Sequence, residues 1–159
     1  MLRESFKTGL GFGVTSGVIT TLGLMVGIYS GTESSFAVIG GILTIAIADS
    51  FSDSLGVHVS KEFENKCTKR EIWEATIVTF ITKFIIAITF VLPILVFSLK
   101  TAVLLSIFWG FLLLTSFSYY MSKVRKINPW YVIAEHLTIG TLVILATHYV
   151  GIFIRNTFI

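Results

Sequence analysis

The sequence predicts an all-α integral membrane protein with five transmembrane helices in a single domain, residues 1–159. Hydrophobic residues make up 54% of the chain and charged residues 13%, and the mean hydropathy is +0.87, which is unusual for a soluble domain. The apolar residues fall in five runs of about 20 residues, long enough to cross a bilayer as helices. They are too long and continuous for barrel strands. The predicted spans are 9–30, 36–59, 72–97, 101–121 and 130–153.

Polar and proline residues mark the ends of the predicted helices. Ser34 is placed to cap the second helix, and a T-x-x-E capping box at 68–71 precedes the third. Asn128 and Pro129 open the fifth helix. Pro93 is expected to kink the third helix near its far end. The first run is long and four more follow it, so we do not expect it to be a signal peptide.

Positive charge sets the predicted orientation. Of the 12 Lys and Arg residues, nine fall on one side of the predicted membrane and two on the other. The positive-inside rule therefore puts the N-terminus in the cytoplasm and the C-terminus outside. Trp73, Trp130 and Tyr131 lie at helix ends as interfacial anchors. The nine are Arg3, Lys7, Lys61, Lys66, Lys69, Arg70, Lys123, Arg125 and Lys126, and the two are Lys100 and Arg155.

The second predicted helix carries two carboxylates inside the membrane, where an ionised group is costly unless paired or used. Asp49 and Asp53 lie about 40° apart around the helix, and Gly56 and Ser60 continue their stripe. His58 points away from this stripe and is interpreted as an interfacial residue.

The first predicted helix has a face of small residues. The spacing G-x-x-x-G occurs at 9–13, 13–17 and 23–27, and it allows two membrane helices to approach closely. Helix packing accounts for the glycines, while Ser16 and Thr20 could also offer oxygen atoms to a pathway. The small face contains Gly9, Gly13, Ser16, Gly17, Thr20, Gly27 and Gly31.

The twelfth basic residue, Lys83, lies inside the third helix. At a rise of about 1.5 Å per residue, Lys83, Asp49 and Thr20 all fall near the membrane centre. Two interpretations remain open. Asp49 and Lys83 form a structural ion pair, or Asp49 is a cation ligand and Lys83 takes the cation's place in the empty site.

A second polar layer is predicted about 6 to 9 Å closer to the cytoplasm. It holds Ser16, Asp53, Glu135 and His136. Asp53 and Glu135 have no obvious basic partner except His136, and such surplus acid indicates a cation or a titrating proton. The predicted cation path therefore uses Asp49 and Asp53 with Glu135 or His136. Carboxylates with an imidazole suit divalent iron or manganese better than soft copper.

Three stretches resemble the vacuolar iron transporter family. GVTSGVITTLGLMVG at 13–27 and GGILTIAIADSFSDSLGVHVSKE at 40–62 are similar to its first two helices, and AEHLTIGTLVILATHYVGIF at 134–153 looks like its last. The resemblance implies a homodimer of five-helix subunits that moves Fe²⁺, and often Mn²⁺, out of the cytosol, coupled to protons. It places the path at a dimer interface between helices one and two, in a prokaryotic cell membrane or a vacuolar-type membrane.

The chain departs from that family's pattern at three places. Ser16 stands where the family commonly has an aspartate, and Phe51 where it has a methionine. About ten residues join the second and third helices, where the family's iron transporters carry a glutamate-rich domain.

His148 lies in the outer third of the last helix, as an exit ligand, a proton acceptor or a packing residue.

The leading functional prediction is a divalent metal transporter without a permanently bound cofactor. The alternatives are a proton or monovalent cation conductor that uses the same carboxylates, and a membrane scaffold. An enzyme is not expected, because the sequence has no H-E-x-x-H, G-x-S-x-G or phosphate-loop motif. The only cysteine, Cys67, excludes an intramolecular disulfide framework. Topology explains the net charge of +3 better than nucleic-acid binding does.

Overall fold

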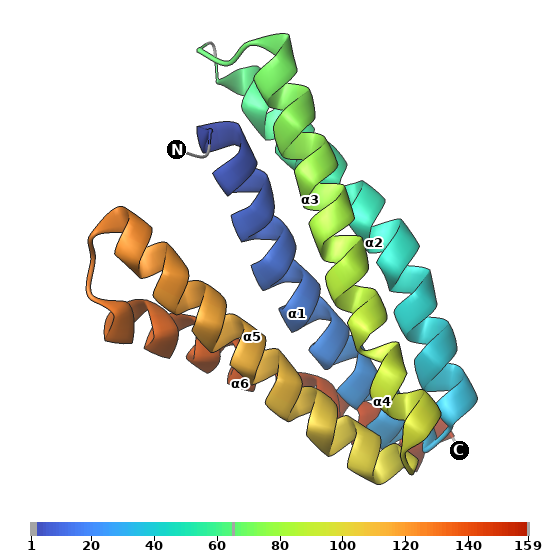
Figure 1. Ribbon diagram of the computed structural model, residues 1–159. Coiled ribbons are helices and arrows are strands. Elements are labelled where there is room, and N and C mark those ends of the chain that lie inside the picture. The colour runs from blue at the N-terminus through green and yellow to red at the C-terminus, as the bar shows by residue number, and fades with distance from the viewer. Residues whose placement is uncertain (1–2, 65, 159) are drawn as a thin grey trace.

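A computed structural model describes residues 3–64 and 66–158, and these residues form helices joined by short connections. Among these residues, five segments are long and apolar enough to cross a membrane when α3 and α4 are counted as one, in agreement with the five helices predicted. The two termini lie at opposite ends of the molecule (Figure 1). The helices are α1 (Glu4–Thr32), α2 (Ser35–Phe63), α3 (Lys69–Thr89), α4 (Val91–Val96), α5 (Leu99–Arg125) and α6 (Pro129–Phe158).

The predicted helix caps are confirmed. Ser34 Oγ accepts a hydrogen bond from the Ala37 N–H at 3.3 Å, at the start of α2. Before α3, Thr68 Oγ1 accepts from the Glu71 N–H at 3.4 Å, and the Glu71 carboxylate accepts from the Thr68 N–H at 2.9 Å. Asn128 Oδ1 accepts from the N–H two residues later at 3.0 Å, just before α6. Each cap satisfies backbone donors that a helix start leaves free.

The predicted kink in the third span is present. α3 ends at Thr89, Phe90 separates it from α4, and α4 continues from Val91. Pro93 has no N–H, and its ring crowds the carbonyl four residues earlier, which is Thr89. The break therefore falls one turn before the proline.

α1 is the central helix of the fold, since it packs against α3, α6, α2 and α5. In Figure 1 it runs between the α2–α3 pair and the α5–α6 pair, which diverge toward the end that holds the N-terminus. The main core lies at the other end, where the two pairs converge. It includes Val18, Leu22, Met25, Val26, Val38, Ile42, Phe90, Val91, Ile94, Ala102, Val103 and Leu114.

The glycines of α1 provide its close contacts with α3. A Cβ atom at Gly9 would lie 2.6 Å from the carbonyl oxygen of Ala75, and one at Gly13 would lie 2.8 Å from Thr82 Cβ. At Gly17 the nearest atoms would also belong to α3. Distances below 3.0 Å leave no room for a side chain, so only glycine permits this approach.

The other end of the same face packs against α6. A Cβ atom at Gly27 would lie 3.4 Å from Thr147 Cβ, and one at Gly31 would lie 3.4 Å from the Gly151 carbonyl oxygen. The prediction of close helix packing is therefore confirmed, but the contacts lie within one chain. Gly13 and Gly17 face α3 of the same chain.

Candidate cation site

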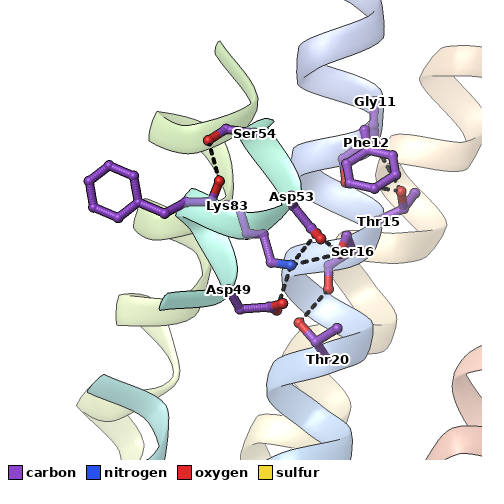
Figure 2. Close-up of polar contacts among 10 residues, drawn as sticks. Gly11, Phe12, Thr15, Ser16, Thr20, Asp49, Asp53, Ser54 and Lys83 are labelled. Atoms are coloured by element: carbon purple, nitrogen blue, oxygen red, sulfur yellow. Dashed lines mark hydrogen bonds and ion pairs between the residues drawn. The ribbon is translucent and has the colours of Figure 1, made fainter. Parts of the chain in front are cut away.

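The candidate site is centred on Lys83, which α3 inserts between α1 and α2. Its side chain is 2% exposed, and its Nζ atom lies 2.5 Å from Asp49 Oδ2. The ammonium donates hydrogen bonds to Ser16 Oγ, at 2.9 Å, and to Asp53 Oδ2. Figure 2 shows the lysine reaching from α3 to both aspartates of α2 and to Ser16 of α1. Three helices thus meet at one buried positive charge.

Of the two carboxylates, Asp53 is held more firmly by hydrogen bonds. The Ser16 hydroxyl donates to Asp53 Oδ2 at 2.6 Å, and the same oxygen accepts from Lys83. The Thr20 hydroxyl donates to the Ser16 carbonyl oxygen at 2.8 Å, one turn along α1. Hydrogen bonds that involve charged groups are stronger than neutral ones, so this network fixes the position of Asp53.

Asp49 is held less firmly. Its Oδ2 atom is buried and lies at ion-pair distance from Lys83, but no hydrogen bond reaches this oxygen from the described residues. The predicted contact between Asp49 and Lys83 is therefore present as an ion pair. The expectation that Asp53 has no obvious basic partner except His136 is wrong, because the lysine bridges two carboxylates that lie one helical turn apart.

Both aspartates open to grooves along the α1–α2 surface. Asp53 lines a groove of about 430 Å³, and Asp49 lines another of the same volume. Ser52 borders both, so the grooves meet on α2. The first groove contains Thr8, Phe12, Ser52, Asp53, Gly56, Val57, Ser60, Lys61 and Glu64, and the second contains Thr20, Leu24, Ile45, Ala48, Asp49 and Ser52.

The Asp53 groove extends to an ion pair near the α2–α3 connection. Lys61 Nζ donates to both carboxylate oxygens of Glu64, at 3.0 and 2.9 Å. The hydrogen bonds from Lys61, followed by one from Cys67, hold the pKa of Glu64 below its usual value of 4.5. Glu64 therefore carries its negative charge at neutral pH, at the mouth of the groove.

Glu135 and His136 do not join the aspartates within one chain. They lie on α6, which packs against α1 and α5. His136 Nδ1 is 2.6 Å from Ser118 Oγ of α5, and Glu135 is exposed. Among the described residues, no group of three or more His, Cys, Asp and Glu side chains is close enough to hold one metal ion.

His148 lies in a separate polar contact between α6 and α1. Its Nδ1 atom is 2.6 Å from Ser30 Oγ. Near the same ends of these helices, Arg155 forms an ion pair with Glu33 at 2.5 Å. His148 therefore links α6 to α1 through Ser30, which belongs to neither predicted polar layer.

The outer face of α2 carries a ladder of small residues that was not predicted from the sequence. Its members recur at every fourth position, and all six are exposed. A Cβ atom at Gly40 or Gly56 would meet nothing within 4 Å, in contrast to the crowded glycines of α1. The four-residue spacing was a readable signal. The small-residue ladder consists of Gly40, Thr44, Ala48, Ser52, Gly56 and Ser60.

No protein-family model, curated protein or solved structure matches this chain. The residues and their arrangement are therefore the basis for assigning a function.

Proposed function

We propose that the protein is a membrane transporter that moves a divalent metal cation, Fe²⁺ or Mn²⁺, out of the cytosol in exchange for protons. The cation passes along the α1–α2 surface through Asp49 and Asp53. The resemblance of residues 13–27 and 40–62 to the first two helices of vacuolar iron transporters supports the same assignment.

The observation that carries this proposal is the buried ammonium group of Lys83 between two carboxylates that open to grooves. Intramembrane charges are costly, and they commonly mark ion pathways. Asp49 and Asp53 already stabilise one positive charge, the ammonium group of Lys83. Asp49, Asp53 and the Ser16 hydroxyl present oxygen ligands of the kind that Mn²⁺ binds, and that Fe²⁺ also accepts.

The charge of the site distinguishes between possible cations. Two aspartates and one ammonium leave one net negative charge, whereas the aspartates alone carry two. A divalent ion is therefore matched when Lys83 withdraws from the aspartates. While Lys83 stays, the site has one net negative charge, which matches a monovalent cation or a proton. A proton or monovalent cation conductor is therefore the second candidate.

A second copy of the chain is the proposed cover for the grooves. The small-residue ladder of α2 is exposed and lies beside Asp49 and Asp53, because Ser52 belongs to both the ladder and the grooves. Small residues at this spacing allow two membrane helices to approach closely. In the homodimer, α2 packs against α2 of the partner, and each copy closes the other's path toward the lipid.

Uptake into proteoliposomes tests the proposal. Purified protein is reconstituted, and the entry of Fe²⁺, Mn²⁺, Zn²⁺, Co²⁺ and K⁺ is measured together with the internal pH. Protein-dependent entry of Mn²⁺ or Fe²⁺ with an opposite proton movement is expected. Movement of K⁺ or protons without any divalent metal would instead establish the second candidate.

A further inference from the structure

His58 lies on the side of α2 that faces α3, away from the cation site. It lines an apolar groove of about 560 Å³ between these helices, together with Phe51, Trp73 and Phe80. The side chain of His58 is 16% exposed, so part of the imidazole is accessible at the edge of this groove. Its ring packs edge-on against Trp73, with 4.8 Å between the ring centroids. The contact with Trp73 limits rotation of the imidazole.

The hydrogen bonds of Thr76 determine which nitrogen of His58 carries the proton. The Thr76 hydroxyl donates to the Ile72 carbonyl oxygen at 2.8 Å. A hydroxyl has one proton, so Thr76 Oγ1 can only accept from the ring. His58 Nδ1 lies 3.0 Å away and is therefore the donor. In the neutral imidazole, Nε2 is then left with a free lone pair.

Another electron-pair donor lies close to that nitrogen. His58 Nε2 is 3.6 Å from Glu62 Oε1, one turn along α2, and the Glu62 side chain is 59% exposed. Two acceptors at this distance repel each other unless a proton or a cation lies between them. Two metal–ligand bonds of about 2.1 Å at a tetrahedral angle place the ligand atoms about 3.4 Å apart. The observed separation is close to this value.

We propose that His58 Nε2 and Glu62 Oε1 are two ligands of a divalent transition-metal ion of borderline softness, such as Zn²⁺ or Cu²⁺, whose remaining positions are filled by water. An imidazole and a carboxylate suit such ions. Metal-binding histidines commonly donate their other N–H to an oxygen, as His58 does to Thr76. The site is separate from Asp49 and Asp53, and it does not depend on the proposed transport.

Copper binding tests this site in the full chain reconstituted in nanodiscs. One equivalent of Cu²⁺ is added, and pulsed electron paramagnetic resonance detects the remote nitrogen of a copper-bound imidazole. The imidazole signal is expected in the wild type and should disappear in His58→Gln. It should persist in His136→Gln and His148→Gln. A signal that survives in His58→Gln, or no imidazole signal in the wild type, overturns the proposal.

Three further variants keep the test decisive if His58→Gln does not fold. Glu62→Gln changes an exposed residue and should weaken Cu²⁺ binding, whereas Glu64→Gln should not. Thr76→Val removes the hydroxyl that orients the ring and should weaken binding by about tenfold. Equal affinity in Glu62→Gln and the wild type overturns the site. A ¹⁵N magnetic resonance measurement at pH 7 gives another outcome that overturns the site. In that outcome His58 is an imidazolium, and one equivalent of Zn²⁺ leaves its spectrum unchanged.

Discussion

At the residue scale, the stability of the protein depends on how Lys83 is compensated. A buried charge that loses its partner is left without compensation, and breaking such a pair typically costs about 3 to 5 kcal/mol. Lys83→Met leaves both aspartates without their shared ammonium, and Asp53→Asn removes the carboxylate that accepts hydrogen bonds from Lys83 and Ser16. Each variant alone should therefore be less stable than the wild type by several kcal/mol.

The double variant separates a structural role of the pair from a functional one. Lys83→Met combined with Asp53→Asn should cost less than the sum of the two single changes, because only Asp49 is then left without the ammonium, whereas Lys83→Met alone leaves two carboxylates without it. Unfolding measured in detergent gives the three free energies. Strictly additive losses would contradict the ion-pair account. A double variant with full stability and full transport would make the pair purely structural.

At the element scale, the glycines of α1 and α2 should respond in opposite ways to alanine. A Cβ atom at Gly13 would lie 2.8 Å from Thr82 Cβ, whereas one at Gly56 would meet nothing within 4 Å. Alanine is about 1 kcal/mol more favourable than glycine inside a helix. Gly13→Ala should therefore lower the unfolding temperature, while Gly56→Ala should keep it or raise it. An unchanged or higher unfolding temperature for Gly13→Ala would contradict the close packing of α1 against α3.

The helices themselves could be predicted from the sequence because their signals are local. The length of each apolar run, the cap at Ser34 and the kink near Pro93 depend on neighbouring residues only. The partner of each helix face could not be predicted in this way. The glycines of α1 indicated a close approach, but any helix can fill such a face, and the structure assigns it to α3 and α6.

Only part of the candidate cation site could be predicted, because the sequence indicates the depth of a residue along its helix but not the neighbours of that helix. Depth estimates brought Lys83 to the level of Asp49, since both lie near the centres of their helices. They could not show that the flexible lysine side chain also reaches Asp53, four residues or about 6 Å further along α2. Depth alone also grouped Glu135 with Asp53, although α6 packs against α1 and α5. Height in the membrane does not determine which helices are neighbours.

At the scale of the whole molecule, the single cysteine offers a test of orientation. Cys67 lies between α2 and α3, on the side that the charge distribution assigns to the cytoplasm. A membrane-impermeant maleimide should label it only after cells are permeabilised. Burial, followed by the hydrogen bond to Glu64, raises the pKa of Cys67 above its usual value of 9.0, so labelling should accelerate as the pH rises toward that pKa. Labelling of Cys67 in intact cells would indicate the opposite orientation.

The proposed dimer depends on the small-residue ladder of α2. Gly56→Leu places a bulky side chain on this exposed face, where its Cβ atom would meet nothing within 4 Å in its own subunit. It should shift the purified protein from dimer to monomer while helix content stays unchanged. Ile81→Leu, an exposed position on α3, is the matched control and should leave the dimer intact. Equal dimer fractions in both variants would place the contact on another face.

The central claim is that Asp49 and Asp53 carry a divalent cation across the membrane. The most direct measurement is Mn²⁺ entry into proteoliposomes that contain equal amounts of wild type, Asp53→Asn and the control Glu33→Gln, which changes an exposed partner of Arg155 outside the grooves. We expect entry in the wild type and the control, and loss of entry in Asp53→Asn that is folded by circular dichroism. Equal Mn²⁺ entry in all three proteins would contradict the claim.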